Sequence, residues 1–203
     1  MASPATIRGK EAPTNARGIP YAPFVDKVED YVTSRAEVEG TLKSFQEMIS
    51  KYQFMEVNQQ RRASGLKVKI PDIQKTLDVV RFLSSRATKN ITAPLETTFE
   101  LNDTLFAKAI VPPTDEVYLW LGANVMLAYP IREAEELLAD KLRVAKESLA
   151  NCDEDQDFLR EQITTLEVAT ARVYNWDVAQ RRKERSSEAE GATGGKEGGD
   201  SKG

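Results

Sequence analysis

The chain has 203 residues, with 28 basic and 32 acidic side chains and a formal net charge of −4. This balance excludes a general electrostatic attraction to nucleic acid, and no apolar run approaches the roughly 20 residues that span a bilayer. The chain has no histidine and one cysteine, which excludes a Ser-His-Asp triad, a His-ligated zinc site and an intramolecular disulfide. The first ten residues lack the apolar stretch of a secretory signal. We expect a cytoplasmic protein, with nuclear entry left open.

Both ends of the chain are poor in large apolar residues. Residues 1–18 mix Pro, Ala, Thr and Gly without periodicity, and residues 184–203 are mainly Gly, Ser, Glu and Lys. Segments of such composition bury too little apolar surface to offset the entropy lost on ordering. We predict disordered tails at both ends and one folded domain over residues 19–183.

A long helix is predicted over about residues 24–88. Ser34 and Glu37 have the spacing of a capping box, which marks a helix start. From Val38 onward, seam positions recur in alternating steps of four and three, the 3.5-residue repeat of a coiled coil. Pro71 lies just off this seam and predicts a kink. The seam positions are Val38, Leu42, Phe45, Ile49, Tyr52, Glu56, Gln59, Ala63, Leu66, Ile70, Ile73, Leu77 and Val80.

Four short strands are predicted in the segment at about residues 95–129. β-branched and aromatic residues dominate it, as is typical of strands. Turn-forming residues separate the strands at Asn102-Asp103, Pro112–Asp115 and Gly122-Ala123. The predicted strands are Glu96–Leu101, Leu105–Val111, Glu116–Leu121 and Asn124–Tyr129.

A second long helix is predicted over about residues 130–183. Pro130 suits the first helical position, and Glu133, Glu135 and Glu136 in the opening turns complement the helix dipole. The coiled-coil repeat again proceeds in unbroken steps of four and three. Its seam positions are Leu138, Leu142, Ala145, Leu149, Cys152, Gln156, Leu159, Ile163, Leu166, Thr170 and Val173.

Two long helices that flank a compact β segment predict an α+β fold. We expect a long antiparallel coiled-coil hairpin with two β-hairpins between the helices. Four strands without a covering helix leave an apolar face and two edges exposed, which soluble proteins normally cover or pair. The strands should therefore contribute to a β-barrel shared between subunits. The residues of this predicted assembly surface are Phe99, Leu101, Phe106, Ile110, Val117, Leu119, Leu121, Val125 and Leu127.

Apolar residues also gather where the antiparallel hairpin would bring the start of the first helix beside the end of the second. One interpretation is a plug that stops the coiled coil from fraying. The other is a surface that contacts unfolded client proteins, because apolar groups at this tip bury little within their own chain. Both interpretations stay open here, and they are compatible. The predicted tip residues are Phe24, Val25, Val28, Tyr31, Val32, Val173, Tyr174 and Trp176.

Other conspicuous residues favour structural interpretations. Cys152 lies on the seam, which indicates a packed rather than a reactive thiol. Glu56, Gln59 and Gln156 are polar seam positions that control register or loosen the coiled coil, with a polar client contact as the alternative. Short basic runs such as Arg181–Lys183 indicate solvated helix surface on an acidic chain.

Six short motifs share the order and spacing of one known family. They are Gly18-Ile19-Pro20, Lys51–Glu56, Ile70–Ile73, Val111–Asp115, Leu119–Leu127 and Ala171–Val178. Together they resemble the prefoldin family, in particular its α-type subunits with two β-hairpins, and most closely the subunit 3 group. The resemblance covers about Gly18 to Lys183. Tyr129-Pro130 departs from it, because the family usually has a small polar residue that caps the second helix there.

The resemblance implies a non-enzymatic subunit of a heterohexameric co-chaperone. Its partners would be one further α-type and four β-type subunits, whose strands form a central double β-barrel. It further implies ATP-independent capture of unfolded actin and tubulin at the arm tips and their delivery to the cytosolic group II chaperonin. No glycine-rich loop has phosphate-cradling spacing, so we expect no cofactor, and neither nucleic acid nor membrane as a partner.

Two other classes of function remain as alternatives. The chain would be a coiled-coil scaffold or adaptor if it bound one folded partner saturably. It would be an enzyme that uses carboxylates if any turnover were measured. Suppressed aggregation of several unrelated unfolded proteins would favour the chaperone.

Overall fold

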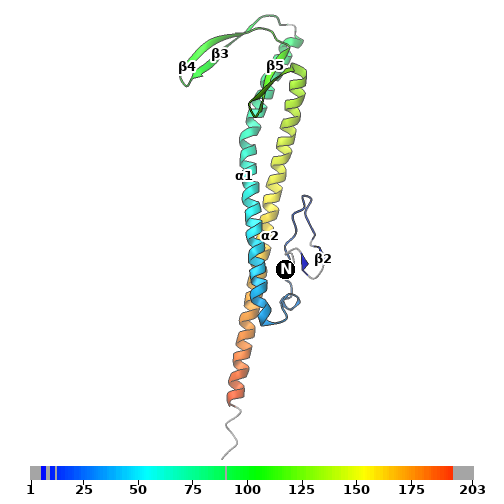
Figure 1. Cartoon of the computed structure of the whole chain (residues 1–203), viewed down its shortest axis with the longest axis vertical. Coiled ribbons are helices and arrows are strands. Elements are labelled where there is room, and N and C mark those ends of the chain that lie inside the picture. Colours follow the sequence, from blue (N-terminus) through cyan, green and yellow to red (C-terminus); the bar gives the residue numbers. More distant parts are fainter. Residues whose placement is uncertain (1–5, 8–9, 12, 90, 194–203) are drawn as a thin grey trace, which may run out of the picture. The chain divides into compact units, whose positions relative to one another are not determined.

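The computed structural model describes residues 6–7, 10–11, 13–89 and 91–193. It has the predicted order of helix, two β-hairpins and helix (Figure 1). Two short strands, β1 and β2, pair near the N-terminus, and one 3-10 turn, η1, precedes the first helix. The elements are β1 (Thr6–Ile7), β2 (Lys10–Glu11), η1 (Val28–Asp30), α1 (Arg35–Thr88), β3 (Leu95–Asn102), β4 (Leu105–Val111), β5 (Glu116–Gly122), β6 (Val125–Pro130) and α2 (Ile131–Thr193).

The chain divides into two compact units, each of which contains part of α1 and part of α2. Unit 1 comprises residues 1–60 and 154–203, and unit 2 comprises residues 61–153. Within each unit the two helices run antiparallel, as the order of the ion pairs between them shows. These pairs are Arg35–Asp177 and Glu56–Arg160 in unit 1, and Lys67–Asp153 and Arg81–Glu135 in unit 2.

The predicted coiled-coil seam is confirmed along both helices. Every seam position from Val38 to Val80 in α1 and from Leu138 to Val173 in α2 is buried or half-buried. Leu77 and Leu159 are almost fully buried, and burial of one such side chain stabilises the fold by about 1.5–3 kcal/mol. The seam is therefore the main apolar contact that α1 and α2 share.

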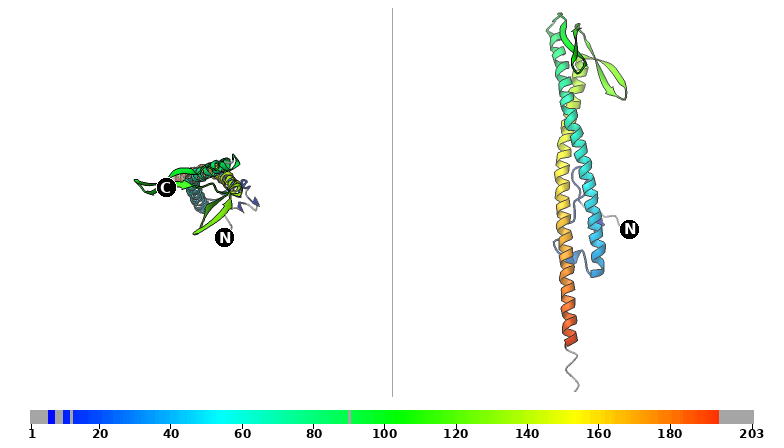
Figure 2. Two further views of the ribbon diagram at one scale, coloured as in Figure 1. Left: turned by 90° about the horizontal axis from the view of Figure 1, so that it is seen from above. Right: turned by 90° about the vertical axis from the view of Figure 1, so that its left-hand side faces the viewer.

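The four predicted strands are found, with each end within one residue of its predicted position. β3 pairs with β4 and β5 with β6, as two separate antiparallel hairpins (Figure 2). The β5–β6 turn has Ala123 and Asn124 at φ 49° and 60°, after Gly122 at φ 91°. Left-handed backbone at both central positions matches the twist of a tight hairpin. Asn124 and Gly122 adopt it readily, whereas Ala123 does so at a steric cost.

Unit 2 has its own core beneath the second hairpin. Leu119 of β5 packs with Leu77 of α1 and with Ile131 and Leu138 of α2. The Ile131 N–H also donates to the Asp115 carbonyl at 3.0 Å, which satisfies one of the free donors at the start of a helix. One face of the β5–β6 hairpin is thereby fixed on the helices of unit 2.

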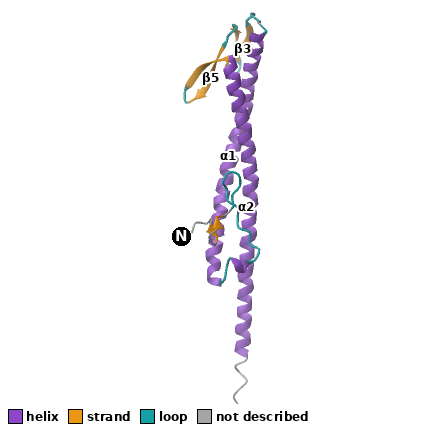
Figure 3. Cartoon of the chain, turned by 90° about the vertical axis from the view of Figure 1, so that its right-hand side faces the viewer, coloured by secondary structure: helices purple, strands orange, loops and turns teal. Residues whose placement is uncertain are grey.

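The N-terminal boundary differs from the prediction. Helix α1 begins at Arg35, directly after Ser34 of the predicted capping box, rather than near residue 24. Residues 13–34 instead run alongside α1 and α2 of unit 1 as an irregular segment (Figure 3). Val25 and Val32 of this segment are buried in the core of unit 1. Contacts with residues about 140 positions away order this segment, and composition alone does not reveal such contacts.

The C-terminal boundary differs as well. Helix α2 continues to Thr193, ten residues beyond the predicted end at Lys183. Ion pairing of Arg35 with Glu184, at 2.5 Å, ties the first residue of this extension to α1. The predicted tail residues 1–5, 8–9, 12 and 194–203 lie outside the described residues.

The start of α1 has a charge-assisted cap. The backbone N–H and the hydroxyl of Thr33 both donate to the Glu37 carboxylate, at 2.9 Å. These hydrogen bonds favour the charged form and hold the pKa of Glu37 below its ordinary value. A lowered pKa stabilises the folded state above the unfolded pKa of about 4.3, and the stabilisation is lost as the pH falls through the folded pKa.

We predict that Glu37→Gln accelerates amide hydrogen exchange in residues 33–40 at pH 7, because the neutral amide accepts weaker hydrogen bonds. The difference from wild type should vanish below the folded pKa, where Glu37 itself is neutral. Glu39→Gln is the matched control, since it removes the same charge two residues away and leaves the cap intact. Identical exchange of wild type and Glu37→Gln at pH 7 would contradict this role for the cap.

Candidate interaction surfaces

The structure divides the nine strand residues of the predicted assembly surface. Seven lie exposed, whereas Val117 is half-buried and Leu119 is only 9% exposed. Large apolar side chains exposed together mark an interaction surface rather than ordinary scatter. The seven exposed residues are Phe99, Leu101, Phe106, Ile110, Leu121, Val125 and Leu127.

The β3–β4 hairpin presents apolar side chains on both of its faces. Phe99 lies opposite Ala107, whereas Phe106 lies opposite Glu100. Because neighbouring residues of a strand point to opposite faces, Phe99 and Phe106 are on different faces, and both are exposed. Neither face of this hairpin is therefore covered by the described part of the chain.

The β5–β6 hairpin buries part of one face, where Leu127 stays exposed, and exposes the other face. Leu119 pairs with Leu127 and Val117 with Tyr129, and this face packs toward the helices of unit 2. Val117 and Leu119 therefore support the fold of their own chain.

The opposite face of β5–β6 carries an aromatic surface that sequence reasoning missed. Tyr118 is 69% and Trp120 is 61% exposed, and Met126, the cross-strand partner of Trp120, is exposed too. The strand is apolar on both faces, so alternation does not reveal which face the helices cover. The size of these side chains was the available signal, because aromatic residues and Met are enriched at interfaces.

Each hairpin also leaves main-chain edges unpaired. Among the described residues, β3–β4 and β5–β6 are each two-stranded sheets. Every one of these strands therefore has one edge whose N–H and C=O groups lack a strand partner. Two-stranded sheets are marginally stable in water and are normally extended by another strand.

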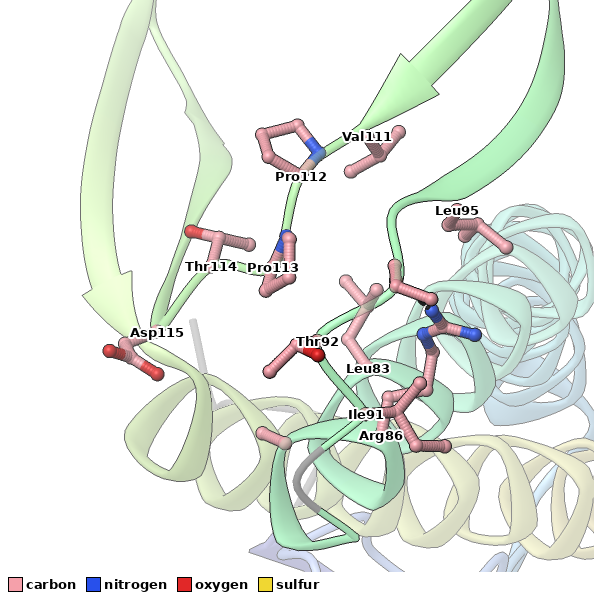
Figure 4. Close-up of a pocket in the computed structure, with 12 residues that line it drawn as sticks. Leu83, Arg86, Ile91, Thr92, Leu95, Val111, Pro112, Pro113, Thr114 and Asp115 are labelled. Carbon is pink, nitrogen blue, oxygen red and sulfur yellow. Dashed lines mark hydrogen bonds between the residues drawn. The ribbon is translucent and has the colours of Figure 1, made fainter.

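A cavity of about 200 Å³ lies where the linker between the hairpins meets the end of α1 (Figure 4). Pro112 and Pro113 form one wall, and Leu83 and Ile91 contribute apolar side chains to the other. The guanidinium of Arg86 donates to the Ala93 carbonyl at 2.6 Å. This hydrogen bond holds the connection between α1 and β3 against the end of α1, and the cavity between that connection and the hairpin linker indicates a structural role in positioning the hairpins.

The predicted tip residues are brought together in unit 1, and most of them are covered. Val25, Val32 and Val173 are buried in its core, and three others pack against that core. Only Phe24 and Tyr174 are largely exposed, at 60% and 57%. The plug interpretation thus describes six of the eight residues. The three that pack against the core are Val28, Tyr31 and Trp176.

The two exposed tip residues have different surroundings. The guanidinium of Arg172 lies 5.2 Å from the ring centroid of Phe24, in cation–π geometry. Tyr174 lines a shallow groove between α1 and α2 together with Leu42 and Ile49. Phe24 and Tyr174 are therefore the two predicted tip residues whose aromatic side chains are largely exposed.

A buried carboxylate that sequence reasoning missed organises the middle of unit 1. Asp155 of α2 is buried, and its Oδ1 accepts from Arg17 Nε at 2.6 Å and from Asn15 Nδ2 at 3.1 Å. Its Oδ2 accepts from Gln59 of α1 at 3.2 Å. A buried charge is tolerated only when it is paired and hydrogen-bonded in this way. Asp155 therefore joins the N-terminal segment to both helices.

The polar seam residues fit the structural interpretation better than a client contact. Gln59 donates to Asp155, and Glu56 accepts from Arg160 across the seam at 2.9 Å. Gln156 is buried. Cys152 is buried as well. The contacts of Gln59 and Glu56 fix the register of the two helices in unit 1 and occupy groups that a client would otherwise contact.

Two further kinds of site are not found in the described part of the chain. No helix there is both long and apolar enough to cross a membrane. Within the same residues, no group of three or more Cys, Asp or Glu side chains is arranged to hold a metal ion.

Comparison with known proteins gives consistent matches. A family model described as "Prefoldin subunit" matches residues 52–176. Prefoldin subunit 3 of Elsinoe fawcettii is 76% identical over 176 residues, 87% of this chain and 88% of its own. Prefoldin subunit 3 of Homo sapiens is 45% identical over 186 residues, 89% of this chain and 93% of its own. A chain of filamentous PFD from Methanocaldococcus jannaschii aligns with a TM-score of 0.41 at 15% identity, over 59% of this chain and 98% of that one, which is too distant to inform on function.

The two faces of β5 should respond differently to a charge. Leu119→Asp places a carboxylate in the core of unit 2 and should lower the free energy of unfolding by about 3 kcal/mol or more. Tyr118→Asp, one residue away, should leave the fold intact and instead weaken association with partner chains. Thermal melting by circular dichroism measures the first effect, and light scattering after co-expression with the partners measures the second. Equal melting temperatures for the two variants would contradict the assignment of faces.

Proposed function

This chain belongs to the prefoldin family, and we propose that it acts as one of two α-type subunits of a heterohexamer that captures unfolded proteins without ATP. The family consists of chaperone subunits rather than enzymes. Its partners would be one further α-type subunit and four β-type subunits, in the cytoplasm. Unfolded actin and tubulin would be its clients, and the cytosolic group II chaperonin would receive them.

The exposed surfaces of the two β-hairpins carry this proposal. A chain that leaves Phe99, Phe106 and Trp120 exposed on two-stranded sheets is incomplete alone. Strands from neighbouring subunits would pair with the free edges and bury these side chains, forming the shared barrel. This requirement for partners favours a subunit of an assembly over a scaffold that works as a single chain.

The tips of unit 1 support the capture of clients. Phe24 and Tyr174 offer each unfolded chain only a small apolar contact, so a single arm should bind weakly. Several arms on one platform raise the effective concentration of the later contacts, which increases affinity by about 10²–10⁴ without any deep pocket. Weak contacts of this kind also allow release to a downstream chaperone.

The proposed mechanism predicts passive holding. Because the sequence has no phosphate-binding loop, ATP with magnesium should leave the affinity of the purified hexamer for urea-unfolded actin unchanged. Release should follow the addition of the group II chaperonin. Fluorescence anisotropy of labelled actin measures both steps. Release on ATP alone, with no second chaperone present, would overturn the passive mechanism.

The exposed tip residues should contribute to capture without affecting assembly. Replacing both Phe24 and Tyr174 with Ser should weaken aggregation suppression by reconstituted hexamers, with an effect that is graded by how many other arms engage the client. The hexamer should persist, because the hairpin strands β3 to β6 belong to unit 2. Val68→Ser, which alters an exposed apolar residue of unit 2, is the control. Unchanged suppression of several clients would leave these residues as part of the plug alone.

A further inference from the structure

The N-terminal segment packs on apolar side chains of both α1 and α2 in unit 1, and the surface beneath it is here called the groove. Along this segment Ile19, Ala22 and Val25 follow one another at intervals of three residues. Ile19 and Val25 are buried in the core of unit 1, and Ala22 packs against it half-buried. The groove is therefore covered by a short stretch of the chain's own polypeptide, which runs beside the helices as a non-helical segment (Figure 3).

The helices contact this stretch through its main chain. Three side chains of α1 and α2 form hydrogen bonds with backbone groups of three residues of this stretch, which lie two and three positions apart in the sequence. The Tyr52 hydroxyl donates to the Pro20 carbonyl at 3.0 Å, the Ala22 N–H donates to Gln162 Oε1 at 2.9 Å, and Arg172 Nη1 donates to the Val25 carbonyl at 2.6 Å.

These three side chains are well suited to bind a main chain. Gln162 is buried, and burial raises the pKa of the Tyr52 hydroxyl, which therefore remains a donor at neutral pH. Backbone C=O groups are common to all polypeptides, and N–H groups to all residues except proline. The polar contacts of the groove hence do not depend on which side chains the bound segment carries.

A separate contact anchors the start of the segment and does depend on side chains. Asn15 Oδ1 accepts from the backbone N–H groups of Arg17 and Ile19, at 3.0 and 2.8 Å, and so closes a turn. Gly18 has the left-handed φ of 82° that this turn requires. The turn presents Asn15 and Arg17 together to the buried carboxylate of Asp155.

We propose that residues 13–25 are a displaceable strap, and that the groove beneath them binds an extended segment of an unfolded client. This inference rests on the proposed function and adds its regulation. The client segment would be extended and would carry small or branched apolar side chains three residues apart, as the strap does. It would use the same three main-chain contacts, whereas the contact with Asp155 belongs to the strap alone.

The strap competes with client segments for the groove and so selects among clients. A tethered segment is present at an effective concentration in the millimolar range, so a weakly binding segment in solution does not displace it. A client that other arms already hold reaches a comparable effective concentration and competes. The apparent affinity of the groove equals its intrinsic affinity multiplied by the fraction of time that the strap leaves the groove open. The strap thus favours clients held at several points.

Hydrogen exchange on the complete hexamer tests this displacement. When urea-unfolded actin binds, the amides of residues 13–25 should lose protection while those of residues 38–52 in α1 keep it. Bound actin with full protection of residues 13–25 would overturn the strap but leave the proposed function standing. A hexamer that binds no actin would instead refute the proposed function. Loss of protection in both regions would indicate unfolding of unit 1 and would also overturn the strap.

A pair of variants tests the same idea by affinity. Arg17→Ala removes the ion pair with Asp155 and should tighten actin binding by up to about tenfold, because the groove opens more often. Arg143→Ala is the matched control, since it removes an exposed arginine of unit 2 whose ion pairs join residues of α2 alone. Equal affinities for Arg17→Ala and Arg143→Ala would contradict the strap.

Discussion

The single apolar seam between α1 and α2 is the contact on which the rest of the structure depends. Two helices that meet along one seam bury only one stripe of each, so every other apolar surface needs cover from elsewhere. In unit 2 part of that cover is the Leu119 face of β5–β6, and in unit 1 it is the segment at residues 13–34. Apolar side chains that remain uncovered on the hairpins and at Phe24 and Tyr174 are available to other chains, and single helix residues such as Phe54 and Val68 are exposed as well.

The polar groups of the two units also make different kinds of contact. In unit 1 the buried carboxylate of Asp155 on α2 accepts hydrogen bonds from Asn15 and Arg17 of the N-terminal segment and from Gln59 of α1, and so joins three segments of the chain. Such a network is expensive to leave half-made, so it specifies one arrangement of the N-terminal segment. In unit 2 the hairpins contribute main-chain edges instead, which accept any strand of suitable register. Side-chain hydrogen bonds thus fix the contacts within the chain in unit 1, whereas unpaired main-chain groups in unit 2 are available to other chains.

The seam and the hairpins were predictable because their signals are local. A 3.5-residue repeat from Val38 to Val80 and turn residues such as Gly122 define elements without knowledge of the rest of the fold. The course of residues 13–34 was not predictable, because it depends on Asp155 and Gln162, which lie about 140 residues away in the sequence. The choice between the Leu119 and Trp120 faces was equally hidden, since both are apolar and only packing on the helices separates them.

Cys152 is a natural chemical probe for opening of the seam. It is the chain's one cysteine, and it is buried on α2. A thiol shielded in this way reacts with an alkylating reagent only in the moments when the helices part, because the thiolate must meet the reagent. The rate at which Cys152 is alkylated in the native chain therefore measures how often α1 and α2 separate transiently around it, with no engineered label.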